Sequence, residues 1–169
     1  GAIYSSCSAG SALEALTGVD DENTSATVKM NFLTTTGLVP ASSHTTAPTP
    51  FVHQFPTDPI AQYMGTTDAA QLKGAEVVYL PKKGGAWNTN AKVLTKSVTQ
   101  SNIPTLSDGP AAINVYGRGF DDPNRGYVFY QAGHTVGGTT AANIAAQRMF
   151  LNFSFFALGD KRKIHLLFH

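Results

Sequence analysis

The sequence predicts an α/β protein: a layered sheet with helices on its faces and mixed strands in its second half. Three observations support this class. A short apolar run at residues 2–7 leads directly into a helix-forming stretch, β-rich runs fill the middle of the chain, and a long apolar helical segment follows them. We expect a single domain over residues 1–158 whose first strands lie upstream of residue 1, so that the chain is a processed product or a fragment of a longer protein.

The first elements follow from local signals. The run at 2–7 predicts a strand, and residues 8–17 predict a helix because Gly18 supplies a natural stop after them. A strand that leads straight into a helix is typical of parallel sheets, where ligands gather at the carboxyl ends of the strands. Residues 28–33 alternate weakly and predict a further strand.

The next segment is less regular. Residues 34–57 are rich in Pro, Ser and Thr, a composition that predicts a long ordered loop or an excursion from the core. A helix is expected after it, at 58–64. Thr57 or Asp58 can cap this helix, a proline fits its first turn, and Gly65 ends it.

The second half of the chain has the clearer patterns. Four runs predict strands, at 76–80, 92–98, 111–116 and 126–130. The last two are joined by residues 117–125, whose Asp-Pro pair and glycines are typical of a hairpin. A helix is predicted from 139 to 158, and so little of its surface is polar that we expect it to be packed on most sides. The basic and apolar tail at 159–169 is expected to be a short strand or a disordered end.

Composition narrows the classes of function. Charged residues make up 14% of the chain, and the neutral polar residues that replace them are common on secreted and cell-surface proteins. The net charge of +1 provides no field to attract nucleic acid or anionic lipid. The most apolar stretch is about half as long as a membrane span, and the single cysteine excludes an internal disulfide. We therefore expect an exported or cell-surface protein with neither a nucleic-acid partner nor a membrane span.

Cys7 and His134 are the candidate catalytic residues. Cys7 lies at the predicted turn from strand to helix, where backbone N–H groups favour a thiolate nucleophile. His134 follows the strand at 126–130 across Gln-Ala-Gly, where an imidazole could hold that thiolate and protonate a leaving group. The alternatives are a buried structural cysteine and a loop histidine that bonds to the backbone. Catalysis requires the two side chains to share one crevice at the rim of the sheet.

Acidic residues give weaker candidates. Glu14 is seven residues, or two helical turns, past Cys7 and could orient a histidine, although a solvated helix residue is the favoured interpretation. Asp20, Asp21 and Glu22 offer oxygen ligands for calcium, but their spacing is not that of a calcium-binding loop, and a solvated turn is favoured.

Other candidates are left open or set aside. His44 and His53 lack the partner pattern of a zinc site, and no cofactor is expected. Trp87, shortly after a Gly-Gly turn, is expected either to stack on a sugar or to pack as a lid.

Two segments resemble one family. Residues 2–14 resemble the cysteine elbow of class I glutamine-amidotransferase-like domains. Residues 126–134, with the helix around 146–152, resemble that superfamily's closing strand, histidine loop and terminal helix. The similarity is to the secreted bacterial, trehalose-utilisation-type branch. The resemblance implies a flavodoxin-like sheet with Cys7 as nucleophile and His134 as base.

The resemblance also implies an oxyanion hole that includes the backbone N–H of Ser8. The chain departs from the family in two places. Glutamine-hydrolysing members carry Gly-x-Cys-x-Gly, and here Ser5 and Ala9 occupy the glycine positions. They also carry His-Pro-Glu, and here Val136 stands in place of the glutamate that orients the imidazole. The triad is incomplete unless Glu14 or an upstream residue substitutes.

These features predict an amidotransferase-like domain whose Cys/His site is degenerate and serves binding or structure. An active cysteine-dependent hydrolase or amidase that uses Cys7 and His134 is one alternative, and a structural subunit of a surface assembly is another. The expected partners are a carbohydrate or other small molecule, and either the rest of the polypeptide or a neighbouring subunit that completes the sheet.

Overall fold

A mixed sheet organises the protein, for which the computed structural model describes residues 1–16, 29–36, 45–46, 50–68, 76–77, 80–99, 104–133 and 137–166. Its five strands lie in the order β1–β9–β8–β7–β3. They are β1 (Ile3–Ser6), β3 (Phe51–His53), β7 (Ala91–Ser97), β8 (Ala112–Arg118) and β9 (Tyr127–Gln131). β1 runs parallel to β9, and the other three pairings are antiparallel. The predicted α/β class is confirmed.

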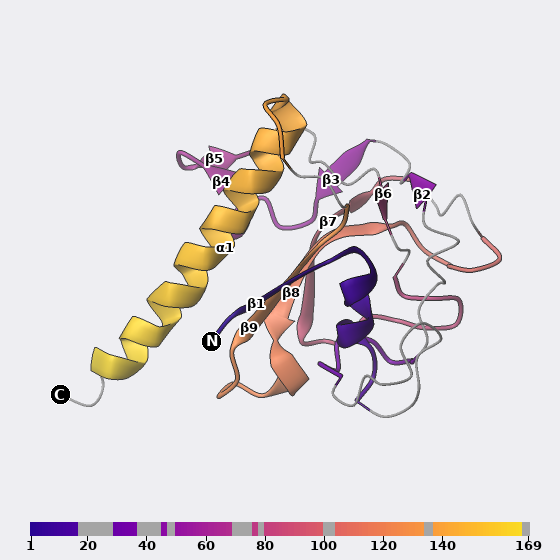
Figure 1. Cartoon of the computed structure of the whole chain (residues 1–169), viewed down its shortest axis with the longest axis horizontal. Helices are drawn as coiled ribbons and strands as arrows, with labels where there is room; N and C mark the ends of the chain where they lie inside the picture. The colour runs from indigo at the N-terminus through magenta and orange to yellow at the C-terminus, as the bar shows by residue number, and fades with distance from the viewer. Residues whose placement is uncertain are drawn as a thin grey trace.

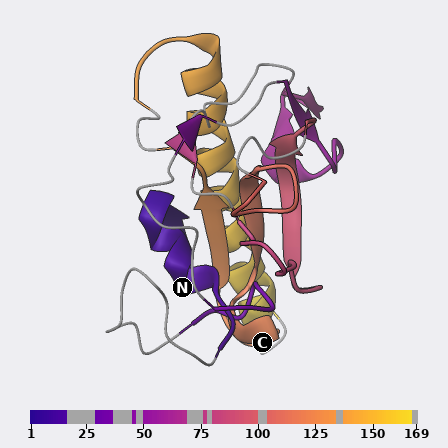
Figure 2. The same cartoon turned by 90° about the vertical axis from the view of Figure 1, so that its right-hand side faces the viewer.

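Helical elements lie on both faces of the sheet. The long helix α1 (Ala141–Leu166) packs along one face and the short 3-10 helix η1 (Cys7–Leu13) on the other (Figure 1, Figure 2). The remaining elements are single turns or two-stranded ribbons: η3 (Pro59–Ala61), η4 (Gly119–Asp121), β2 (Thr45–Thr46) with β6 (Glu76–Val77), and β4 (Gln62–Tyr63) with β5 (Thr66–Thr67).

Alternation along β9 produces two cores. Val128 and Tyr130 join the core on the η1 side of the sheet, which also contains Leu13. Phe129 lies between them in sequence, points to the other face and stacks on Phe153 of α1, with ring centroids 4.9 Å apart. Because side chains of a strand alternate between faces, β9 is buried on both.

The helix α1 is buried along one stripe. The residues that face the sheet are spaced four apart: Ala145, Met149, Phe153 and Ala157. Five large apolar side chains of α1 outside this stripe are exposed, and the three most exposed are Leu151 at 51%, Phe155 at 71% and Leu158 at 55%. The prediction of a helix packed on most sides is therefore wrong for the part of the chain that the structure describes.

The predicted strands are largely confirmed. The runs at 92–98, 111–116 and 126–130 form β7, β8 and β9, and the run at 2–7 forms β1. Of the strand predicted at 76–80, the structure describes β6, which pairs with β2 outside the main sheet, and then Leu80.

Two predicted helices are shorter than expected. The helix at 8–17 is the 3-10 helix η1, which ends at Leu13. The helix at 58–64 is the single turn η3; Asp58 caps it and Pro59 opens it as expected, but the chain then extends into β4. Gly65 does not end a helix and lies in the turn between β4 and β5, with φ at 79°.

Two further expectations are corrected. Within residues 29–33, the predicted strand is reduced to an isolated bridge between Leu33 and Trp87. Over residues 159–166 the tail is helical rather than a strand, because α1 continues to Leu166. Among the described residues, no helix is both long and apolar enough to cross a membrane.

The two edges of the sheet come from different parts of the chain. β1 lies at one edge of the five-stranded sheet that the described residues form, and the expectation of further strands upstream of residue 1 stays a prediction. Part of the Pro/Ser/Thr-rich segment 34–57 contributes the opposite edge, because β3 pairs with β7.

Phe153 is buried and Phe155 is exposed on the same helix, so their replacement is expected to affect stability very differently. Replacing the buried Phe153 with Ala removes the stacking on Phe129 and is expected to lower the free energy of unfolding by about 3–5 kcal/mol. The matched control Phe155→Ala, at an exposed position of the same helix, is expected to change it by about 0.5 kcal/mol or less. Urea denaturation of both variants measures the difference, and equal losses would contradict the described orientation of α1.

Candidate functional site

The parallel pair β1–β9 ends where the candidate catalytic residues lie. Its register pairs Ser6 with Gln131, so both strands reach the same end of the sheet together. Cys7 follows Ser6 as the first residue of η1, and Ala132 and Gly133 continue from β9. We call this end of the pair the β1–β9 rim. His134 and the side chains of Cys7 and Ser8 lie outside what the structure describes, so their predicted roles remain predictions.

Gln131 connects the β1–β9 rim to the helix α1. Its side chain is fully buried and donates from Nε2 to the carbonyl oxygen of Ala146 in α1, at 3.0 Å. Its Oε1 accepts a hydrogen bond from the Tyr4 hydroxyl of β1, at 3.2 Å. One amide therefore joins β1, β9 and α1, and a buried polar group with both ends bonded holds a single geometry.

Small residues allow η1 to lie close to the sheet. A Cβ on Gly10 would come 3.1 Å from Leu80 and 3.3 Å from the ring of Tyr130. These approaches are tighter than normal contacts, so a larger residue at position 10 would push η1 away from β9. Gly10 thus allows the turn after Cys7 to pack onto the sheet.

Glu14 is not the solvated residue that the sequence favoured. Its side chain is fully buried, and its Oε2 pairs with Nζ of the equally buried Lys29 at 3.2 Å. The 3-10 helix η1 rises about 2.0 Å per residue, so Glu14 follows the end of η1 roughly 14 Å along the chain axis from Cys7. The ion pair gives this carboxylate a partner other than a histidine at the rim.

Of the remaining acidic and histidine candidates, the structure describes only His53. Asp20, Asp21, Glu22 and His44 lie outside the described residues. His53 bonds through its two ring nitrogens to the Thr95 hydroxyl, at 3.0 Å, and to the Asp68 carbonyl oxygen, at 2.9 Å. Within the described part of the chain, no group of three or more His, Cys, Asp and Glu side chains is placed to hold a metal ion.

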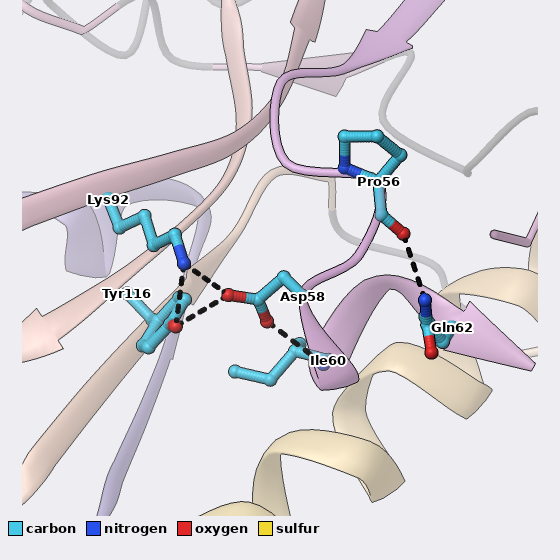
Figure 3. Close-up of polar contacts among 6 residues, drawn as sticks. All are labelled: Pro56, Asp58, Ile60, Gln62, Lys92 and Tyr116. Atoms are coloured by element: carbon cyan, nitrogen blue, oxygen red, sulfur yellow. Dashed lines mark hydrogen bonds and ion pairs between the residues drawn. The ribbon is translucent and has the colours of Figure 1, made fainter. Parts of the chain in front are cut away.

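Sequence reasoning missed a polar cluster centred on Asp58. The carboxylate caps η3 by accepting from the Ile60 N–H at 3.0 Å, and it also accepts from the Tyr116 hydroxyl at 2.7 Å (Figure 3). Lys92 of β7 forms an ion pair with the same carboxylate. The cap was visible in the sequence because Asp precedes Pro there. The other two partners come from strands 34 and 58 residues away, and no local pattern joins them.

Burial and this cluster together raise the pKa of the Tyr116 hydroxyl. Burial raises the pKa of its hydroxyl well above the usual value, and the hydrogen bond and negative charge of Asp58 raise it further. Tyr116 therefore stays protonated in the folded protein under strongly alkaline conditions.

A cleft opens on another part of the sheet. Its volume is about 400 Å³, and its walls come from the segment after β3, from the turn around Trp87, from β7 and from the chain before β8. The aromatic and proline rings of the wall are Phe55, Pro81, Trp87 and Pro110, and its polar side chains are Gln54 and Lys96. We call this the Trp87 cleft.

Hydrogen bonds of its backbone and of the next residue fix the position of Trp87. It forms the bridge to Leu33, and the neighbouring Asn88 side chain donates to the carbonyl oxygens of Asn31, at 3.1 Å, and Leu33, at 3.2 Å. The indole is half-buried against the η1-side core and lines the cleft. The indole thus packs on the core and also lines the cleft, while its stacking on a sugar and its role as a lid both stay predictions.

Comparison with known proteins finds no relative: no protein-family model matches the chain, no curated protein matches its sequence, and no solved structure matches its fold.

The Tyr116 hydroxyl predicts a pH dependence of stability. An unfolded tyrosine ionises near pH 10. Because folded Tyr116 keeps its proton there, the unfolded state binds fewer protons above this pH, and the free energy of unfolding falls as pH rises. The loss attributable to Tyr116 is expected to approach about 1.4 kcal/mol per pH unit above roughly pH 10.5.

Urea denaturation at near-neutral and alkaline pH measures this loss. Tyr116→Phe is expected to start about 1 kcal/mol less stable at neutral pH and to fall less steeply at alkaline pH. Tyr63→Phe, at a side chain 48% exposed, is the matched control and is expected to keep the wild-type slope. Identical slopes for wild type and Tyr116→Phe would show that Tyr116 ionises in the folded state.

Proposed function

We propose that this chain is an amidotransferase-like α/β domain of an exported or cell-surface protein, in which the β1–β9 rim binds a carbohydrate or other small molecule rather than hydrolysing glutamine. The observation that supports this most directly is the parallel register that pairs Ser6 with Gln131. It brings the turn at Cys7 and the chain that leads toward His134 to one end of the sheet, where open α/β sheets bind their ligands.

The flavodoxin-like arrangement is part of the proposal. β1 and β9 supply the parallel pair that such a sheet needs at its centre, and η1 follows β1 as the elbow of that fold requires. The free edge of β1 would then receive further parallel strands, from the rest of a longer polypeptide or from a neighbouring subunit.

The assignment to binding rests on the missing orienting carboxylate. A catalytic imidazole needs a group that holds its tautomer and orientation. Val136 stands where the glutamine-hydrolysing members of the family that the chain resembles carry glutamate. The nearest substitute suggested by the sequence, Glu14, is paired with Lys29 at the far end of η1. A binding site can keep the shape of this rim without the proton relay.

An active cysteine hydrolase is the second candidate. The backbone at Cys7 favours it, because the residue opens a helix directly after a parallel strand. In that function the Cys7 thiolate attacks an acyl or amide carbon, His134 transfers the proton to the leaving group, and the Ser8 N–H stabilises the oxyanion. A structural subunit is the third, favoured by the exposed apolar residues of α1.

Disulfide trapping tests whether the rim brings the two residues together. The variant His134→Cys is expected to form a disulfide with Cys7 under mild oxidation, because a disulfide requires Cα atoms about 4.4–6.8 Å apart. The control His165→Cys, near the end of α1, is expected to remain reduced within the same time. Non-reducing peptide mapping identifies the bond, and cross-linking in the control alone would overturn the shared site.

Alkylation separates binding from catalysis. Intact mass is followed after mild iodoacetamide treatment at neutral pH, for the wild type, His134→Ala and the control His165→Ala. The proposal predicts slow labelling of folded Cys7 at the same rate in all three proteins, and no release of ammonia from glutamine. Rapid labelling that is lost only in His134→Ala would overturn it in favour of the hydrolase, because only a paired thiolate depends on that imidazole.

A further inference from the structure

The Trp87 cleft has the size and walls of a small-molecule site. Ligand sites in proteins are mostly apolar concavities of about 300–1,000 Å³ with a few placed polar groups. The cleft's volume of about 400 Å³ falls in this range. Its rings, from Trp87, Phe55 and two prolines, offer flat apolar surfaces on which a ring can stack.

An irregularity in the sheet brings Lys96 into this cleft. Ala91 and Val93 of β7 line it, and strict alternation would send Lys96 to the opposite face. The register between β7 and β8 shifts on both sides of Thr95, and Lys96 then lines the cleft beside its partner Ala112. β-Bulges of this kind redirect a side chain and are frequent next to functional sites.

The charge of Lys96 is available to a ligand. Among the described residues it has no ion-pair partner, and no Asp or Glu lines the cleft. Lys92, on the same strand, provides the contrast, because its ammonium group pairs with Asp58. A half-buried cation beside apolar walls gains most from an anionic partner that also displaces water.

We propose that the Trp87 cleft binds a small carboxylate with a flat apolar ring. The ring stacks on Trp87, the carboxylate pairs with Lys96, and the amide of Gln54 is placed to supply a further hydrogen bond. A pyranose fits the walls less well, because most of its hydroxyls would lie against carbon, where unpaired polar groups are unfavourable. This inference is independent of the β1–β9 rim and of its proposed function.

The single tryptophan reports this site directly. Because Trp87 is the only tryptophan in the sequence, its fluorescence follows occupancy of the cleft without interference from a second indole. The probes are phenylacetate and its neutral isostere phenylacetamide. Phenylacetate is expected to give a saturable change in Trp87 emission, and phenylacetamide to bind about tenfold more weakly because it lacks the charge.

Two substitutions of Lys96 test whether its positive charge binds the carboxylate of the probe. Lys96→Met keeps the length and apolar stem of the side chain and is expected to weaken phenylacetate binding about tenfold while leaving phenylacetamide unchanged. Lys96→Arg is expected to retain most of the binding. Equal affinity for the two probes in the wild type, or equal loss of both in Lys96→Met, would overturn the role of Lys96.

A third variant is designed to narrow the cleft. Gly109 lines it, and a Cβ there would meet no atom within 4 Å, so Gly109→Leu adds a large side chain at the cleft wall without a clash at its Cβ. It is expected to abolish the response to both probes. Gly159→Leu, at an equally open position on α1, is the matched control and is expected to bind like the wild type. Urea denaturation establishes that each variant is folded.

Other outcomes are equally decisive. The absence of any saturable response in the wild type, or full binding by Gly109→Leu, would overturn the proposal. Cys7→Ser is expected to bind phenylacetate normally, so a failure at the Trp87 cleft is distinguishable from a failure at the β1–β9 rim.

Discussion

Burial of β9 on both faces and both edges is the constraint on which the rest of the structure depends. β9 pairs with β1 on one side and β8 on the other, while its side chains enter the η1-side core and the α1-side core in turn. Phe129, Tyr130 and Gln131 have no exposed surface. A strand bonded on both edges and packed on both faces cannot change register by one residue without moving apolar side chains from one core into the other.

That fixed register positions the functional features. The rim exists because β1 and β9 end together, and Gln131 ties the end of β9 to α1 and β1. On its other side β9 pairs with β8, and the pairing of β8 with β7 contains the register shifts around Thr95 beside which Lys96 of β7 lines the Trp87 cleft. One continuous sheet thus supports two separate candidate sites that share no residue.

Local patterns predicted the main strands but not the helices' extents. β7, β8 and β9 are recognisable because their alternation or apolar content extends over enough residues to outweigh single exceptions. η1 is shorter than predicted because the carbonyl oxygens of Ala12, Leu13 and Glu14 accept hydrogen bonds from residues 30–33 instead of from a further helical turn. α1 is longer and continues past Gly159, where Asp160 pairs with Arg118 of β8. Propensity alone does not contain these tertiary contacts.

Features of the candidate sites were predictable only where their interactions lie within one segment of the chain. The turn at Cys7 and the cap at Asp58 are local, and both lie where the sequence indicated. Asp58, Glu14 and Trp87 each contact a residue that is distant in the sequence. No local sequence pattern around Glu14 or around Lys29 predicts that the two are buried together as an ion pair. Long-range pairings of this kind follow from the packed sheet rather than from spacing along the chain.

The outward side of α1 has a consequence for behaviour at high concentration. Leu151, Phe155 and Leu158 form a water-facing apolar strip, and the whole chain carries a net charge of only +1. Copies of the protein therefore repel one another weakly, and contact between such strips releases ordered water. This strip is therefore expected to favour association at neutral pH, and a kosmotropic salt such as sulfate, which screens the weak repulsion and strengthens apolar contact, is expected to lower the concentration at which the protein remains dispersed.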